Sequence, residues 1–162
     1  MDSLVVTLNE FNRHYLHRLI DSIPDKELDA TFGEGSHSAR WILSHLAIAA
    51  DYGFKQLGMP MQATVLWHKA YGPSSEGNTH ATVRPSKTEL LQFIDVQYSA
   101  LCKATLEADD TKLVDPHAIP ILAETPLKSK RDLLGHILGS HFATHVGQLS
   151  AWRRLIGLPP LF

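Results

Sequence analysis

Cysteine, excess positive charge and long apolar runs are scarce in this sequence, and each scarcity excludes a class of protein. Cys102 is the only cysteine, so the chain cannot form an internal disulfide. The 15 Lys and Arg residues against 17 Asp and Glu residues give a net charge of -2, which provides no basic field for nucleic acid. Apolar runs stay far below the roughly 20 residues that cross a bilayer. We therefore expect an ordinary soluble protein that binds neither nucleic acid nor membrane.

Length and the opening residues predict organisation and location. The 162 residues fit one domain, and we expect residues 1–162 to form it. The chain begins with an acidic residue, Asp2, where a secretory signal would carry basic ones, so we expect a cytoplasmic protein. What the sequence has in abundance is histidine, with 10 residues. The positions of those histidines decide which functions the sequence favours.

Strand-like alternation is nearly absent, and apolar residues recur instead at helical spacing in four long segments. We expect helices over 3–23, from Ser38 to Gly58, from the capping box Ser86–Glu89 onward, and from about Ser129 to Gly157. The spacing in the first segment predicts an inward face made of Val5, Leu8, Phe11, Tyr15, Leu19 and Ile23. Because each apolar stripe must be buried against another helix, these segments predict an all-α four-helix bundle.

The connection from Met59 to Lys87 is much longer than the links that usually join antiparallel neighbours. It is long enough to run the height of the bundle, so we expect helices 2 and 3 to be parallel and joined by a crossover. The crossover contains candidate substrate-pocket residues, which are Trp67, His68, Tyr71 and His80. We expect the second long connection, over 109–128, to shape the same pocket.

His141 and His145 are four residues apart in the last predicted helix. Residues at this spacing lie one above the other on a helix, within reach of a single metal ion. Leu138 and Leu149 belong to the same stripe, so both imidazoles should point into the bundle. The alternative is a pair of core histidines that are hydrogen-bonded to Tyr or Gln.

His45 lies on the inward stripe of the second helix and supplies a third imidazole. Three histidine ligands leave metal positions open for water or substrate, which is typical of a catalytic site. The alternative for His45 is a lone core histidine near Tyr52. The side chains that could hydrogen-bond to the imidazoles and orient them are Gln148, Tyr52 and Asp51. His136 lies off the stripe, and we expect it at the surface or at an interface.

Two motifs resemble the DinB/YfiT-like superfamily of metal-dependent enzymes. The string His141-x-x-x-His145-x-Gly147-Gln148-Leu149, closing on Gly157-Leu158-Pro159-Pro160, is similar to its C-terminal signature. The string Trp41-Ile42-Leu43-Ser44-His45-Leu46 is similar to its helix 2 signature. The resemblance implies a four-helix bundle with a long crossover, a divalent metal, usually zinc or nickel, held at His45, His141 and His145, and frequent dimers.

The resemblance predicts the site better than the reaction. The superfamily includes thiol-dependent S-transferases, a maleylpyruvate isomerase and members assigned as hydrolases. We expect a homodimeric, metal-dependent enzyme that activates water or a low-molecular-weight thiol toward a small-molecule substrate. Two alternatives remain: a non-catalytic bundle that binds a metal or small ligand, and a structural bundle whose inward histidines are hydrogen-bonded.

Overall fold

The computed structural model describes residues 3–33, 35–73, 75 and 83–161. Helices make up the regular structure of these residues, which contain no strand beyond the isolated bridge between Pro116 and Ser129. The long elements are α1 (Ser3–Ile20), α2 (Ala39–Gln56), α4 (Lys87–Glu107) and a last helix made of α6 (Lys130–Gly135), a π turn (His136–His141) and α7 (Phe142–Leu155). The connections hold the short helices α3 (Val65–Tyr71) and α5 (Asp110–Leu113) and the 3-10 turns Asp25–Glu27 and Pro120–Leu122. Nowhere in this part of the chain is a helix both long and apolar enough to cross a membrane.

Side-chain caps begin the long helices where the sequence predicts them. Ser38 accepts a hydrogen bond from the Trp41 amide at the start of α2. Ser86 and Ser129 each form a complete capping box, with Glu89 and Asp132 respectively. These contacts pair amide groups that a helix leaves without partners in its first turn, which fixes where α2, α4 and α6 begin.

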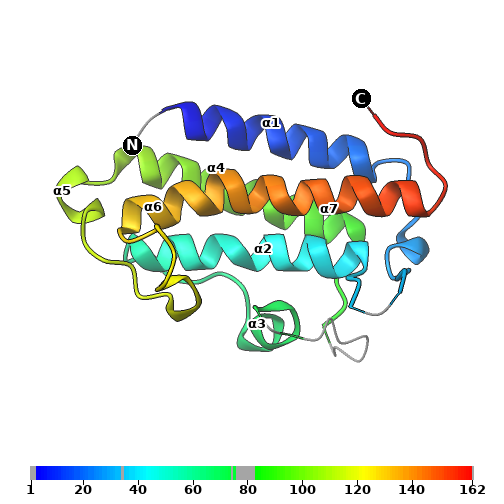
Figure 1. The fold of residues 1–162 in the computed structure, drawn as a ribbon, viewed down its shortest axis with the longest axis horizontal. Coiled ribbons are helices and arrows are strands. Elements are labelled where there is room, and N and C mark those ends of the chain that lie inside the picture. Colours follow the sequence, from blue (N-terminus) through cyan, green and yellow to red (C-terminus); the bar gives the residue numbers. More distant parts are fainter. Residues whose placement is uncertain (1–2, 34, 74, 76–82, 162) are drawn as a thin grey trace.

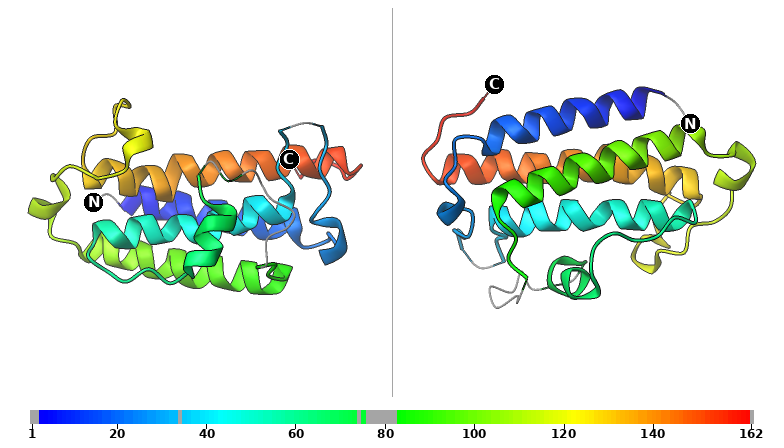
Figure 2. Two further views of the ribbon diagram at one scale, coloured as in Figure 1. Left: turned by 90° about the horizontal axis from the view of Figure 1, so that it is seen from below. Right: turned by 180° about the vertical axis from the view of Figure 1, so that it is seen from behind.

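The four long helices lie side by side, and their directions confirm the predicted fold (Figure 1). α1 and α7 run one way along the bundle, while α2 and α4 run the other way. α2 packs against both α4 and α7, and α1 packs against the other sides of α4 and α7 (Figure 2). The second and third long helices, α2 and α4, are therefore parallel neighbours, joined by a crossover that contains α3.

The inward face of α1 differs from the predicted one. Leu8 and Phe11 are 48% and 56% exposed, whereas Asn9 and Leu16 are fully buried. Apolar residues surround much of this helix, so their spacing does not define a unique inward face. The contacts that α1 makes with α4 and with the π turn select the face that is buried.

Candidate metal centre

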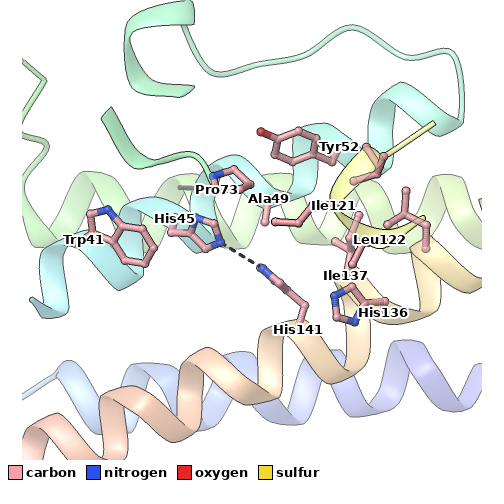
Figure 3. A pocket seen from close by; sticks show the side chains of 12 residues that line it. Trp41, His45, Ala49, Tyr52, Pro73, Ile121, Leu122, His136, Ile137 and His141 are labelled. Carbon is pink, nitrogen blue, oxygen red and sulfur yellow. Dashed lines mark hydrogen bonds between the residues drawn. The ribbon is translucent and has the colours of Figure 1, made fainter. Parts of the chain in front are cut away.

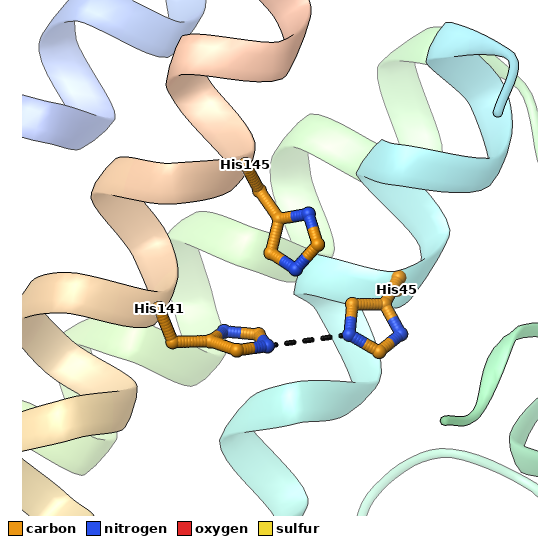
Figure 4. Close-up of side chains that lie close together, drawn as sticks. All are labelled: His45, His141 and His145. Atoms are coloured by element: carbon orange, nitrogen blue, oxygen red, sulfur yellow. Dashed lines mark hydrogen bonds between the residues drawn. The ribbon is translucent and has the colours of Figure 1, made fainter. Parts of the chain in front are cut away.

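Three histidines from two long helices of the bundle, α2 and the last one, meet in its interior. His45 projects from α2, His141 ends the π turn and His145 lies in the first turns of α7 (Figure 4). One ring nitrogen from each lies within 4.8 Å of the other two. The Nε2 atoms of His45 and His141 are 3.2 Å apart. The structure thus brings together the three residues that the sequence singles out as metal ligands.

Two of the imidazoles are oriented by hydrogen bonds on their far side. His45 Nδ1 donates to the carbonyl oxygen of Tyr71 at 2.6 Å. His145 Nδ1 donates to Gln148 Oε1 at 2.8 Å. Because Nδ1 carries the proton in each ring, Nε2 keeps its lone pair and faces the centre of the cluster.

His141 has a different arrangement. Its Nδ1 atom is buried and has no hydrogen-bond partner among the described residues. Because His45 Nε2 is an acceptor, the proton of a metal-free His141 lies on Nε2, which donates to His45. A cation at the centre would take the place of that proton.

Burial and mutual repulsion keep the three rings neutral. Burial lowers the pKa of His141 to about 2, and His145, His45 and His136 add to the effect. Burial also lowers the pKa of His145 to about 4, with a further contribution from His45. The pKa of His45 is lowered by burial as well, against the opposing effect of its bond to Tyr71. Neutral imidazole is the form that binds a metal ion.

The donor set fits a divalent cation. Zn–N bonds of about 2.0–2.1 Å in a tetrahedral site place two ligand nitrogens about 3.3 Å apart. The separation of 3.2 Å between His45 Nε2 and His141 Nε2 is close to this value. Three convergent nitrogen atoms, two of them fixed by hydrogen bonds on the opposite ring nitrogen, are the arrangement in which protein zinc sites are built.

The π turn brings a fourth histidine, His136, beside the cluster. On a regular α-helix, His136 would lie about 140° around the axis from His141. The i→i+5 bonding of a π turn adds a residue to the turn and moves residues five apart toward the same side. The ring centroids of His136 and His141 are 5.5 Å apart, and His136 is half-buried. The prediction that His136 lies off this face, at the surface or at an interface, is therefore wrong.

Asn9 of α1 holds the π turn in place, and the sequence analysis missed it. Its Nδ2 donates to the carbonyl oxygen of Leu138 inside the turn at 2.9 Å, and the Asn9 side chain is fully buried. A buried carbonyl displaced from α-helical pairing needs such a donor. The signal that could have found Asn9 is a polar residue within the apolar stretch of α1, but the spacing of apolar residues places it on the wrong face.

A cavity of about 370 Å³ opens beside His45 and His141 (Figure 3). Trp41 and Tyr52 line it from α2, and Pro73 from the crossover. The 109–128 connection forms another wall, as the sequence predicts. The main aliphatic side chains of the lining are Ala49, Ile119, Ile121, Leu122, Leu133 and Ile137.

Tyr52 and Asp51, the other two side chains predicted to orient the imidazoles, make no hydrogen bond to the cluster among the described residues. Tyr52 lines the cavity and meets His68 edge to face. Asp51 is fully buried, and its carboxylate accepts from the amides of Gln62 and Ala63 and from His68 Nε2. Asp51 and His68 therefore hold the crossover against α2, and neither of them orients an imidazole of the cluster.

The described crossover residues that the sequence predicts for the pocket, Trp67, His68 and Tyr71, are not among its lining residues. Trp67 packs against α4 through an aromatic contact, and neither Trp67 nor His68 is among the described residues that line the cavity. Tyr71 contributes its backbone carbonyl to His45 rather than its ring to the cavity. His80 lies outside the described residues.

The comparison with known families agrees with this geometry. The model of the DinB superfamily matches residues 8–149 of the chain. The chain belongs to the DinB superfamily. Among solved structures, this DinB-superfamily chain is similar to YfiT from Bacillus subtilis, described as "a probable metal-dependent hydrolase with an unusual four-helix bundle topology". The match has a TM-score of 0.69 and 13% identity, and it covers 97% of this chain and 88% of YfiT. No curated protein sequence matches the chain.

Replacing Gln148 with alanine is expected to weaken zinc binding by about 10–100-fold, because the His145 ring loses the acceptor that holds its Nδ1 proton. Gln148 is exposed, so the fold should be unaffected. Competition with a chromophoric chelator measures the affinity. Thr144→Ala, at another exposed position of α7, is the matched control and should bind zinc as the parent does. Equal affinities in the two variants would show that solvent replaces the Gln148 amide.

Proposed function

We propose that this DinB-superfamily protein is a metal-dependent hydrolase of small molecules, with one divalent cation held by His45, His141 and His145. The observation that carries the proposal is the convergence of three neutral imidazoles, two of which, those of His45 and His141, line an apolar cavity. Neutral imidazole suits zinc and nickel, and these are the two cations that we propose. The likeness to YfiT supports the fold, and its description as a metal-dependent hydrolase agrees with the reaction class.

The chain's own residues prepare the centre for this chemistry. The Tyr71 carbonyl and the Gln148 amide fix two of the three rings before any ligand arrives. With only three protein ligands, one or more metal positions stay open toward the cavity. A cation bound there supplies a Lewis acid that activates water, or a thiol, at neutral pH. The aliphatic residues of the 109–128 connection limit the access of bulk water to the reacting group.

No acidic residue lines the described part of the cavity. The aromatic and histidine side chains that face it, Tyr52 and His136, are the polar groups available to position a substrate beside the cluster. A thiol-dependent transfer would use the same three ligands and the same open position. The two reactions therefore differ in the co-substrate rather than in the metal centre.

The test is turnover by the full-length protein after its metal has been removed and restored. We expect p-nitrophenyl esters of short uncharged acids to be hydrolysed after reconstitution with zinc or nickel, and not by chelator-treated protein. Metal-dependent consumption of a low-molecular-weight thiol with an electrophile, without ester or amide hydrolysis, would make the protein an S-transferase. A full equivalent of bound metal with neither activity would identify a binding module.

A further inference from the structure

The cavity beside the three histidines has an uncharged wall. Twelve described residues line it, and none of them is Arg, Lys, Asp or Glu. Its volume of about 370 Å³ equals roughly a dozen water molecules in the liquid, which is room for a small ring system with a short substituent. The polar groups on the wall are the three imidazoles of His45, His136 and His141, together with Tyr52.

This wall sets the chemistry of a ligand that fills the cavity. A charged group remote from the metal would lose its hydration and find no opposite charge among the described lining residues. An apolar body would gain from leaving water, because Ile119, Leu122 and Ile137 offer it aliphatic surface. Polar partners are confined to the four side chains of His45, His136, His141 and Tyr52 among the described lining residues, so the reacting group belongs next to His45 and His141.

The aliphatic wall is held in place before a ligand binds. His117 Nε2 donates to the Leu127 carbonyl at 3.0 Å, and its Nδ1 accepts from the Ile119 amide at 3.2 Å. His117 thus joins two stretches of the 109–128 connection that lie on either side of the turn Pro120–Leu122. This part of the cavity wall is therefore ordered in the absence of a ligand, so a ligand that contacts it binds with little entropic cost of ordering the loop.

We propose that the substrate is a neutral small molecule whose non-reacting part is an apolar ring or branched aliphatic group of about a dozen non-hydrogen atoms. This inference rests on the proposed function, because it takes the cavity as the place where the substrate of the metal centre binds. A substrate or thiol that carries several carboxylates is excluded from the cavity by the same argument. Such a molecule would have to keep its charges outside, in solvent.

The first test compares three probes that share one ring system: neutral indole, anionic indoleacetate and cationic tryptamine. Equilibrium dialysis against metal-free, full-length protein measures the cavity without any coordination by the metal. We expect indole to bind at least ten times more tightly than either charged probe. Equal or tighter binding of indoleacetate or tryptamine, or no binding of indole at millimolar concentration, would overturn the proposal.

Two positions in the same connection provide a matched pair of variants. Ile121 lines the cavity and Val114 does not, while both side chains are 66% exposed. Ile121→Lys is expected to weaken indole binding several-fold and to strengthen indoleacetate binding, because it brings a positive charge to the mouth. Val114→Lys adds the same charge outside the cavity and should leave both affinities unchanged. Equal effects of the two lysines would show that the probes bind elsewhere.

A second variant fills the cavity rather than charging it. Ala49 lines the cavity from α2, one turn beyond His45, and Ala100 is exposed on α4. Ala49→Phe is expected to abolish indole binding and to keep the metal equivalent, whereas Ala100→Phe should change neither. Turnover with charged substrates only would refute this inference and leave the metal-dependent function standing. Tight, selective indole binding by a protein that takes up no metal would refute the function and leave the selectivity of the cavity standing.

Discussion

Replacing His141 with alanine is expected to reduce bound zinc from about one equivalent to a small fraction of one. His141 lies against both other members of the cluster, with its ring centroid 4.5 Å from that of His145 and 5.3 Å from that of His45. Its loss leaves two nitrogens from two different helices, and the affinity should fall by more than the 10–100-fold that an outer hydrogen bond contributes. Elemental analysis after dialysis against zinc gives the stoichiometry.

The fold should survive this substitution in the metal-free protein. Among the described residues, His141 makes one hydrogen bond in the cluster and leaves a buried Nδ1 without a partner, so its removal relieves a polar group that burial disfavours. Circular dichroism before and after heating checks the fold independently of metal. A loss of helix in His141→Ala would make its zinc content uninformative, and His141→Gln then repeats the test with the side-chain volume largely kept.

His136→Ala is the matched control for His141→Ala. It removes an imidazole from the same π turn, with its ring centroid 5.5 Å from that of His141, but His136 does not belong to the group of three convergent nitrogens. We expect it to keep the full metal equivalent. Retention of zinc by His141→Ala, or an equal loss in both variants, would show that the ligand set is a different one.

Trp41 offers a second measure of metal uptake. Its ring stacks on that of His45, with centroids 4.8 Å apart and planes 7° from parallel. A cation bound to His45 therefore changes the surroundings of this indole, and titration by fluorescence follows loading of the wild type and its absence in His141→Ala.

The elements that the sequence predicts correctly are those fixed by local chemistry. Capping boxes at Ser86 and Ser129 bond within four residues of chain, so their signal is complete in the sequence. The crossover followed from a connection too long for a turn, and the parallel α2 and α4 confirm it. The convergence of His45 with His141 and His145 followed from helical stripes, because each stripe must face the core.

The elements that sequence reasoning missed depend on distant parts of the chain. The π turn that brings His136 toward His141 is stabilised by Asn9, which is 129 residues away from its partner Leu138. The group that orients His45 is the backbone carbonyl of Tyr71, and a backbone atom leaves no trace in residue types. Asp51 was selected for its nearness to His45 in sequence, but its helical angle directs it to the crossover.

The residues that line the cavity could not be predicted from the sequence either. The sequence predicts aromatic residues such as Trp67 as pocket residues, because large side chains stand out in a loop sequence. The cavity is instead lined by aliphatic residues of the other connection, including Ile119 and Leu122, whose role depends on how the chain folds back at His117. Periodicity cannot place residues in such a segment because it has no regular repeat.

Lowering the pH is expected to destabilise the metal-free protein, and the loss of stability should begin at a pH well above that at which carboxylates become protonated. The pKa of His141 is about 2 and that of His145 about 4 in the folded chain, against about 6.5 for histidine in an unfolded chain. At a pH between the folded and the unfolded pKa of each histidine, the ring is protonated in the unfolded state and neutral in the folded state. The free energy of unfolding therefore falls as the pH drops below 6.5, by about 1.4 kcal/mol per pH unit for each such histidine.

The two histidines together should lower the free energy of unfolding by about 4 kcal/mol between pH 7 and pH 5. Burial also lowers the pKa values of His37 and His136, which adds to the loss with the same sign. Depressed carboxyl groups such as Asp132 act in the same direction but only near and below pH 4, outside this window. Urea unfolding of chelator-treated protein at a series of pH values measures the slope.

The double variant His141→Gln/His145→Gln decides whether the cluster causes this slope. Glutamine keeps polar side chains at both positions and does not titrate, so the pH dependence between pH 7 and pH 5 should lose about two protons' worth of slope. His14→Gln, on α1 and outside the cluster, should keep the wild-type slope. If the double variant and the wild type share one slope, the rings accept protons in the folded state, and their neutrality, on which the metal assignment depends, is wrong.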